Sequence, residues 1–222
     1  MMIEPLIFFA GAPGSRWSTV GKVICQLPIF DNSDQSARRN YQHHEFAGHF
    51  GNYFGPGMEF GHNFDKLDRL TQDEIASELR RPFGKQKQNR YRLVKSHVFS
   101  YHLDHIRNTF PQSGIMVVWR DSRTCLDWWL KLGGFDIPYP DYTWYRDEET
   151  MSKHIQEENR NIEKFVDAQG LQLELMQPEW IRKVFNQVPE IVQKDYFPDV
   201  YVAANFAIHE RLQLINGDSL NA

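Results

Sequence analysis

A glycine- and hydroxyl-rich turn near the start of the chain has the composition of an anion-binding loop. The segment GAPGSRWST, residues 11–19, follows a short apolar run and precedes a helical pattern. In a strand–turn–helix arrangement, the backbone N–H groups of the turn and the positive end of the helix converge on one place, which favours a phosphate or sulfate. Ser15, Ser18 and Thr19 could donate hydroxyl hydrogen bonds there, and Arg16 could add a charged fork. The alternative is a tight turn in which Ser15 or Ser18 only caps the helix.

The turn lacks the lysine that a nucleoside-triphosphate loop requires. Gly14 permits close approach of the backbone to a ligand. The Walker pattern G-x-x-x-x-G-K-[ST] nevertheless fails, because Trp17 and not lysine precedes Ser18. A kinase or a GTPase is therefore disfavoured.

Two ionisable residues stand two positions apart in the apolar segment YRLVKSHVF, residues 91–99. In a β-strand this spacing places Lys95 and His97 on the same face. Burying both without a purpose would be costly, so we expect them at a strand end that faces a cleft. A neutral imidazole can accept a proton, and an ammonium group can stabilise an oxygen that gains negative charge. A strand end that is merely polar is the alternative, because K-x-H is a short motif.

A third basic residue ends the apolar segment GIMVVWR, residues 114–120. A helical pattern follows, and Asp121 or Ser122 is expected to cap it. Arg120 would then lie at the same edge of the sheet as the first loop, where it could pair with a phosphate. An ion pair with Asp121 or another neighbouring carboxylate is the alternative.

Alternating strand and helix patterns are expected to position these residues. Strands are predicted at 6–11, 91–99, 114–120 and 171–176, and helices at 18–27, from 71, and at 101–110, 122–132, 148–168 and 178–194. Thr71 and Glu74 form a capping box at the second helix, and Gly170 stands where the fifth should end. We therefore predict one α/β domain over residues 1–222: a three-layer sandwich with a central parallel sheet flanked by helices, and a P-loop-like strand–loop–helix at the N-terminus.

Two long connections interrupt the alternation, at residues 31–66 and 133–147. Both exceed the usual connection length, so they either line a substrate cleft at the carboxyl ends of the strands or pack over the core. The first contains four histidines without the HExxH or CxxC spacing of a zinc site, so no metal is predicted. These are His43, His44, His49 and His62.

Composition indicates an ordinary globular chain. Apolar residues make up 41% and charged residues 24% of the 222 residues, and the net charge of −4 does not favour nucleic-acid binding. Cys25 and Cys125 lie in apolar helical contexts and are expected to be reduced thiols. No signal-peptide or membrane-spanning pattern is present, so we expect a cytoplasmic chain without membrane contact.

The order of the motifs resembles that of the sulfotransferases, whose sulfuryl donor is 3′-phosphoadenosine 5′-phosphosulfate (PAPS). Residues 13–18 match the family's first loop, which follows a pattern like P-[KR]-[SA]-G-T-[TS] and holds the donor's 5′-phosphosulfate. Lys95 and His97 match its K-x-H pair, in which the histidine is the catalytic base. Arg120 and Asp121 match its strand-ending R-[ND]-P, in which the arginine binds the 3′-phosphate. The resemblance implies Lys95 and His97 as catalytic residues and, as donor-binding residues, Gly14, Ser15, Arg16, Trp17, Ser18, Thr19 and Arg120.

The chain departs from the family pattern at three positions of the donor site, one of which is Trp17, where the family has a small hydroxyl residue. Gly14 stands where the family has a basic residue, which makes Arg16 the substitute, and Trp128 stands where the family has a serine. The implied reaction moves a sulfuryl group from PAPS to a hydroxyl or amine of a small or carbohydrate-like acceptor and releases adenosine 3′,5′-bisphosphate (PAP). One alternative is a non-catalytic nucleotide-binding module on the same fold. A nucleotide-dependent phosphotransferase is weaker, because the Walker lysine is missing.

Overall fold

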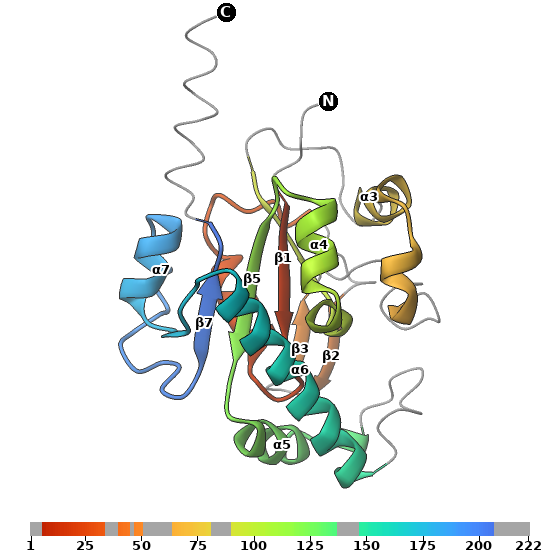
Figure 1. Ribbon diagram of the computed structural model, residues 1–222. Helices are drawn as coiled ribbons and strands as arrows, with labels where there is room; N and C mark the ends of the chain where they lie inside the picture. Colours follow the sequence, from red (N-terminus) through yellow and green to blue (C-terminus); the bar gives the residue numbers. More distant parts are fainter. Residues whose placement is uncertain are drawn as a thin grey trace, which may run out of the picture.

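A five-stranded mixed sheet forms the centre of the protein (Figure 1). The computed structural model describes residues 6–33, 40–44, 47–50, 64–80, 90–136 and 147–206. The strand order is β4–β1–β5–β7–β6, in which β4 and β5 both run parallel to the central β1. The bounds of these strands are Leu6–Gly11 for β1, Arg92–Lys95 for β4, Gly114–Trp119 for β5, Glu174–Leu175 for β6 and Tyr201–Ala204 for β7.

The α/β character is confirmed, but the prediction of an all-parallel sheet is wrong. The segment after α7 returns as β7, a strand that was not predicted, and pairs antiparallel with both β5 and β6. The strand predicted at 171–176 is limited to residues 174–175, and the helix predicted at 178–194 ends at Phe185. Asn186 ends that helix in the left-handed conformation, with φ 56°, and Pro189 follows shortly after it.

Six α-helices lie within the described ranges, and several match the predicted segments closely. The helix predicted at 148–168 forms over those residues, with the Asp147 side chain accepting a hydrogen bond from the Thr150 N–H group. The predicted capping box is also present, because the Glu74 carboxylate accepts from the Thr71 N–H group at 2.8 Å. The helices are α1 (Trp17–Ile24), α3 (Gln72–Arg80), α4 (Leu103–Thr109), α5 (Ser122–Lys131), α6 (Glu148–Ala168) and α7 (Pro178–Phe185).

Short 3₁₀ helices and a hairpin complete the described elements. They are η1 (Phe64–Arg69), η2 (His97–Tyr101), η3 (Gly134–Asp136) and the antiparallel pair β2 (Asn40–His44) and β3 (Ala47–Phe50). Much of the two predicted cleft loops, together with His62, lies outside the described residues. No helix within the described ranges is long and apolar enough to cross a membrane.

Alternate side chains of β1 enter two separate hydrophobic clusters. Ile7 and Phe9 pack with residues of α1 and α7, whereas Phe8 and Ala10 pack with residues of α4 and α6. Successive side chains of a strand point to opposite faces of its sheet, so each face of β1 is covered by a different pair of helices. Cys25 and Cys125 are both buried and are not joined by a disulfide.

The strand that carries the K-x-H motif is shorter than predicted. β4 ends at Lys95, and Ser96 begins the turn into η2, its hydroxyl accepting a hydrogen bond from the Val98 N–H group. His97 is the first residue of η2. His97 therefore lies just beyond the strand, at the start of η2, whereas Ser96 between Lys95 and His97 is still extended, with φ −155° and ψ 145°.

Candidate anion-binding site

Two residues in the left-handed conformation form the turn between β1 and α1. Gly14 has φ 78° and Arg16 has φ 65°, and the Ser15 N–H group donates to the Ala12 carbonyl at 3.1 Å. Arg16 occupies the N-cap position of α1, and its own side chain makes no capping hydrogen bond. The alternative in which Ser15 or Ser18 serves as the cap is therefore wrong. The buried Ser15 hydroxyl has no hydrogen-bond partner among the described residues.

Gly14 is required by close packing of this turn against α5. A Cβ atom at Gly14 would lie 1.9 Å from the carbonyl oxygen of Cys125, well inside van der Waals contact. The φ of 78° is also a conformation that residues with a side chain rarely adopt. The turn is thus set directly against the residues that follow β5.

The Arg16 guanidinium lies between two aromatic rings. Its Cζ atom is 4.8 Å from the centroid of Phe197 and 5.6 Å from that of Trp128, distances typical of cation–π contacts. Within the described part of the chain, its buried Nε has no hydrogen-bond partner. Burial lowers the pKa of Arg16, the nearby charge of Arg120 lowers it further, and Asp199 opposes the change. A bound anion would offset both the free-energy cost of burying this charge and its repulsion by Arg120.

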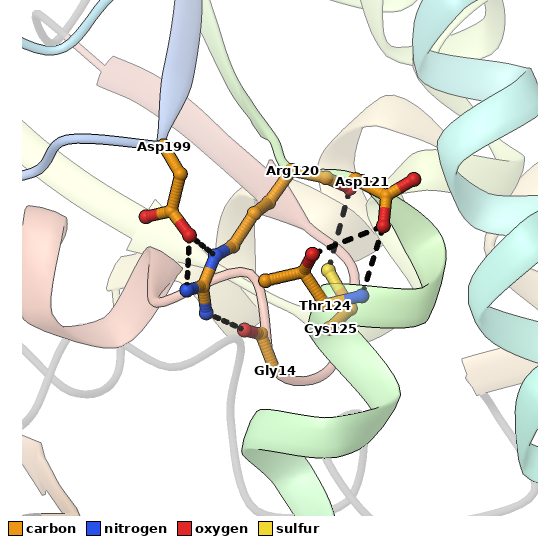
Figure 2. Close-up of polar contacts among 6 residues, drawn as sticks. All are labelled: Gly14, Arg120, Asp121, Thr124, Cys125 and Asp199. Carbon is orange, nitrogen blue, oxygen red and sulfur yellow. Dashed lines mark hydrogen bonds and ion pairs between the residues drawn. The ribbon is translucent and has the colours of Figure 1, made fainter.

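Arg120 bonds at the same time to the Asp199 carboxylate and to the backbone of the turn between β1 and α1, called the anion loop below (Figure 2). Its Nε donates to Oδ2 of Asp199 at 2.9 Å, its Nη2 donates to the same oxygen, and its Nη1 donates to the Gly14 carbonyl at 3.3 Å. The guanidinium carbon also lies 5.5 Å from the ring centroid of Trp128. The predicted alternative of an ion pair with a carboxylate is confirmed, but the partner is Asp199.

Asp121 has the capping role expected of it. Its side chain accepts from the Thr124 N–H group at 2.9 Å and from the Thr124 hydroxyl at 3.0 Å. These hydrogen bonds lower the pKa of Asp121. Asp121 therefore caps the N-terminus of α5, and the Arg120 guanidinium bonds instead to the Gly14 carbonyl and to Asp199.

Lys95 lies close to the first loop although it belongs to a different strand. β4 neighbours β1, with Lys95 in register with Phe9, and the Lys95 side chain is only 1% exposed. Its Nζ lies 5.7 Å from the ring centroid of Trp17, the first residue of α1. The side chain of His97 lies outside the described part of the structure. Thus the structure brings Lys95, the loop and Arg120 to the same edge of the sheet.

Ser18 and Thr19 are placed in the first turn of α1, where both are partly exposed. Both therefore remain candidates for contact with a ligand at this end of the helix. Trp17 is buried instead, and its ring lies 5.8 Å from that of Phe9, centroid to centroid. Trp17 thus contributes to the core beneath the loop.

The segment before β7 contacts both arginines of the site, although none of its residues was predicted to belong there. Residues 196–199, before β7, supply Phe197 beneath Arg16 and Asp199 to Arg120. The exposed Tyr196 is near enough to Arg16 to raise the pKa of that guanidinium, against the larger effect of burial. The short apolar run VYVAA after Pro198 and Asp199 was the available signal, because it indicates a strand with an acidic residue just before it.

Positive charge exceeds negative charge around Trp128. Arg16, Arg120 and Lys131 each place a cationic group within 5.6 Å of the Trp128 ring centroid. Asp199 is the carboxylate that pairs with one of them. Such an excess, beside a turn with unpaired donors, suits an anionic ligand. Within the described ranges, no group of three or more His, Cys, Asp or Glu side chains is arranged to hold a metal ion.

No protein-family model matches the chain, and no curated protein matches it. The candidate function therefore depends on the chemistry of these residues.

Proposed function

We propose that this chain is a sulfotransferase that moves a sulfuryl group from PAPS to a hydroxyl or amine acceptor. The supporting observation is the pair of guanidinium groups at the β1–α1 turn, Arg16 and Arg120, beside the unpaired Ser15 hydroxyl. The proposal includes the finer fold expected of the family, a three-layer sandwich with a P-loop-like first turn. It also includes the motif order that the sequence shares with sulfotransferases.

The residues present fit a donor with two separate anionic groups. Arg16 Nε and Ser15 Oγ are buried polar atoms to which no described residue is hydrogen-bonded, which is costly unless a ligand supplies the missing hydrogen bonds. They would hold the phosphosulfate, together with the backbone N–H groups of the loop. Arg120 would contact the 3′-phosphate, as the resemblance implies. Trp128 would separate the two, because both guanidinium groups lie against its ring.

The proposed reaction is an in-line transfer at sulfur. His97 would take the proton from the acceptor hydroxyl or amine as that group forms its bond to sulfur, a contribution of about 10²- to 10⁴-fold. The bond between sulfur and the bridging oxygen breaks, and PAP leaves with the electron pair on that oxygen. The Lys95 ammonium, buried beside the loop, would offset the charge that develops there.

A ligand titration tests the donor assignment. Unfolding temperatures are measured with PAP, ATP and GTP, and PAP is expected to stabilise the chain most. A ligand at about 1,000 times its Kd stabilises a protein by about 4 kcal/mol. Stabilisation by ATP or GTP but not by PAP would instead favour a phosphotransferase and reject the proposal.

A transfer assay tests the reaction. Labelled sulfate from PAPS is followed onto a panel of hydroxyl and amine acceptors, with the wild type, His97→Ala and the control His105→Ala, whose residue lies on α4. We expect His97→Ala to abolish transfer and leave PAP binding nearly unchanged, and the control to retain both. Normal turnover in His97→Ala would reject the assigned base.

A non-catalytic nucleotide-binding module is the second candidate. The observation that favours it is the engagement of Arg120 by Asp199 and by the Gly14 carbonyl, which leaves fewer of its N–H groups for a phosphate. PAP binding without transfer to any acceptor would support this candidate over the enzyme.

A further inference from the structure

Two consecutive residues of α6 are buried although both side chains are polar. Glu158 is 1% exposed and Asn159 is 2% exposed, whereas their neighbours Glu157 and Arg160 are exposed. Each of the two has one oxygen without a hydrogen-bond partner in the ranges that the structure describes, Oε2 of Glu158 and Oδ1 of Asn159. Leaving buried polar atoms incompletely bonded is costly, so the pair calls for an explanation beyond packing.

Asn159 is bonded to the end of β5. Its Nδ2 donates to the Arg120 carbonyl at 2.8 Å and to the Ser122 hydroxyl at 2.9 Å. These atoms lie on either side of the junction between β5 and α5, where the Arg120 side chain turns toward Asp199 and Gly14. Asn159 therefore fixes the backbone from which the Arg120 guanidinium projects.

Glu158 is bonded to the turn that begins with His97. Its carboxyl group forms a hydrogen bond with Ser100, which lies in η2. A second contact joins the same two elements, because the Tyr101 hydroxyl lies 3.3 Å from Nδ1 of His154 on α6. Figure 1 shows α6 running across the sheet toward α5, so one helix reaches both η2 and the β5–α5 junction.

Burial disfavours the charged form of the Glu158 carboxyl group. Burial raises its pKa well above the ordinary value, and the hydrogen bond with Ser100 and the charge of Glu157 act in opposite directions. The other titratable groups around it are His154 on α6, Tyr101 in η2 and Cys125 on α5, and burial raises the pKa of both Tyr101 and Cys125. A neutral acid can donate and accept hydrogen bonds, which an amide of the same shape can also do.

We infer that Glu158 and Asn159 are positioning residues for the two halves of the proposed site. Glu158 holds the η2 turn that carries the proposed base, and Asn159 holds the strand end that carries Arg120. This inference rests on the proposed function. It assigns different consequences to the two residues: loss of Glu158 affects the chemical step, and loss of Asn159 affects binding of the donor.

The experiment compares Glu158→Ala, Glu158→Gln and Asn159→Leu with the control Glu157→Ala. Three quantities are measured: amide hydrogen exchange in residues 97–101, the Kd of PAP, and kcat for sulfuryl transfer. We expect Glu158→Ala to speed exchange in residues 97–101 about tenfold, as expected for the loss of one buried hydrogen bond. It should also reduce kcat by about 10- to 100-fold with little change in the Kd of PAP.

Glu158→Gln is expected to restore both exchange and kcat, because glutamine keeps the shape and the hydrogen bonds of a neutral acid. Asn159→Leu is expected to weaken PAP binding about tenfold without faster exchange in residues 97–101. The inference is overturned if Glu158→Gln behaves like Glu158→Ala, or if the Glu158 and Asn159 variants change the same quantities. If the wild type transfers no sulfuryl group, the proposed function fails, whereas the exchange and PAP measurements still test the positioning roles.

Discussion

Arg120 and Asp199 lie 79 residues apart in the chain, yet two nitrogens of the Arg120 guanidinium donate to one oxygen of the Asp199 carboxylate. The Arg120 side chain is 8% exposed and that of Asp199 is 43% exposed. The pair joins the end of β5 to the segment before β7 and, through the Gly14 carbonyl, to the anion loop. It also places a negative charge where the proposed donor would bring its own.

Replacing Asp199 by asparagine should strengthen binding of PAP. The substitution removes a carboxylate that repels the ligand and competes for Arg120, so we expect the Kd of PAP to fall about tenfold by calorimetric titration. Asp195→Asn is the matched control, because it makes the same change of charge at an exposed residue four positions away. Weaker binding in Asp199→Asn would show that the carboxylate orients Arg120 for the ligand.

Replacing Gly14 by alanine should lower the free energy of unfolding more than replacing a glycine whose only constraint is its positive φ. The new Cβ would lie 1.9 Å from the Cys125 carbonyl, and φ at Gly14 is 78°. Gly133→Ala is the control, because Gly133 has φ 89° and, apart from its chain neighbours, no described residue has an atom within 4 Å of the added Cβ. We expect a loss of about 1–2 kcal/mol for Gly133→Ala and a clearly larger one for Gly14→Ala in urea unfolding. Equal losses would contradict the close packing of the loop against α5.

The buried Glu158 carboxyl should make stability fall as pH rises. Its pKa is raised in the folded state, so the native protein holds a proton that the unfolded chain releases between the two pKa values. The contribution is present below the unfolded pKa and is lost as pH rises toward the folded pKa. We expect Glu158→Gln to gain stability relative to the wild type between about pH 5 and about pH 8, measured as unfolding temperature. A difference that is constant over this range would mean that the carboxyl does not titrate differently on folding.

Removing the Asp121 cap should weaken α5 with the opposite dependence on pH. Asp121→Ala is expected to cost about 1 kcal/mol near neutral pH, because the N–H group of Thr124 loses its acceptor. Hydrogen bonds lower the pKa of Asp121 in the folded state, so this contribution is present above the unfolded pKa and fades as pH falls through the folded pKa. Chemical unfolding at several pH values measures it.

Asp127→Ala serves as the control for the cap. Asp127 forms an exposed ion pair with Arg123 one turn away on the same helix, and such pairs contribute little. We expect its removal to cost less than about 0.5 kcal/mol. A cost as large as that of Asp121→Ala would assign the effect to helix charge instead of the cap.

Sequence patterns correctly predicted those helices and strands whose stabilising residues lie within or directly beside them. Residues 148–168 form α6 as predicted, because the apolar stripe lies within the segment and its end signals lie directly beside it. These are the aspartate before the first residue and the glycine shortly after the last. The strands at 6–11 and 114–119 and the Thr71–Glu74 capping box follow from neighbouring residues in the same way. The strand predicted at 91–99 was too long because apolar residues 98 and 99 continue a strand pattern, although β4 ends at Lys95 and η2 begins at His97.

The sequence by itself determined which residues could bind an anion, because glycine, hydroxyl and basic side chains reveal their chemistry at any position. Only the tertiary structure decided their partners. The antiparallel entry of β7 places Asp199 against Arg120, and the passage of α6 across the sheet buries Glu158 against η2. Such contacts depend on how distant segments pair, and the free energy that selects the pairing comes from burial of the whole core, which no short stretch of sequence contains.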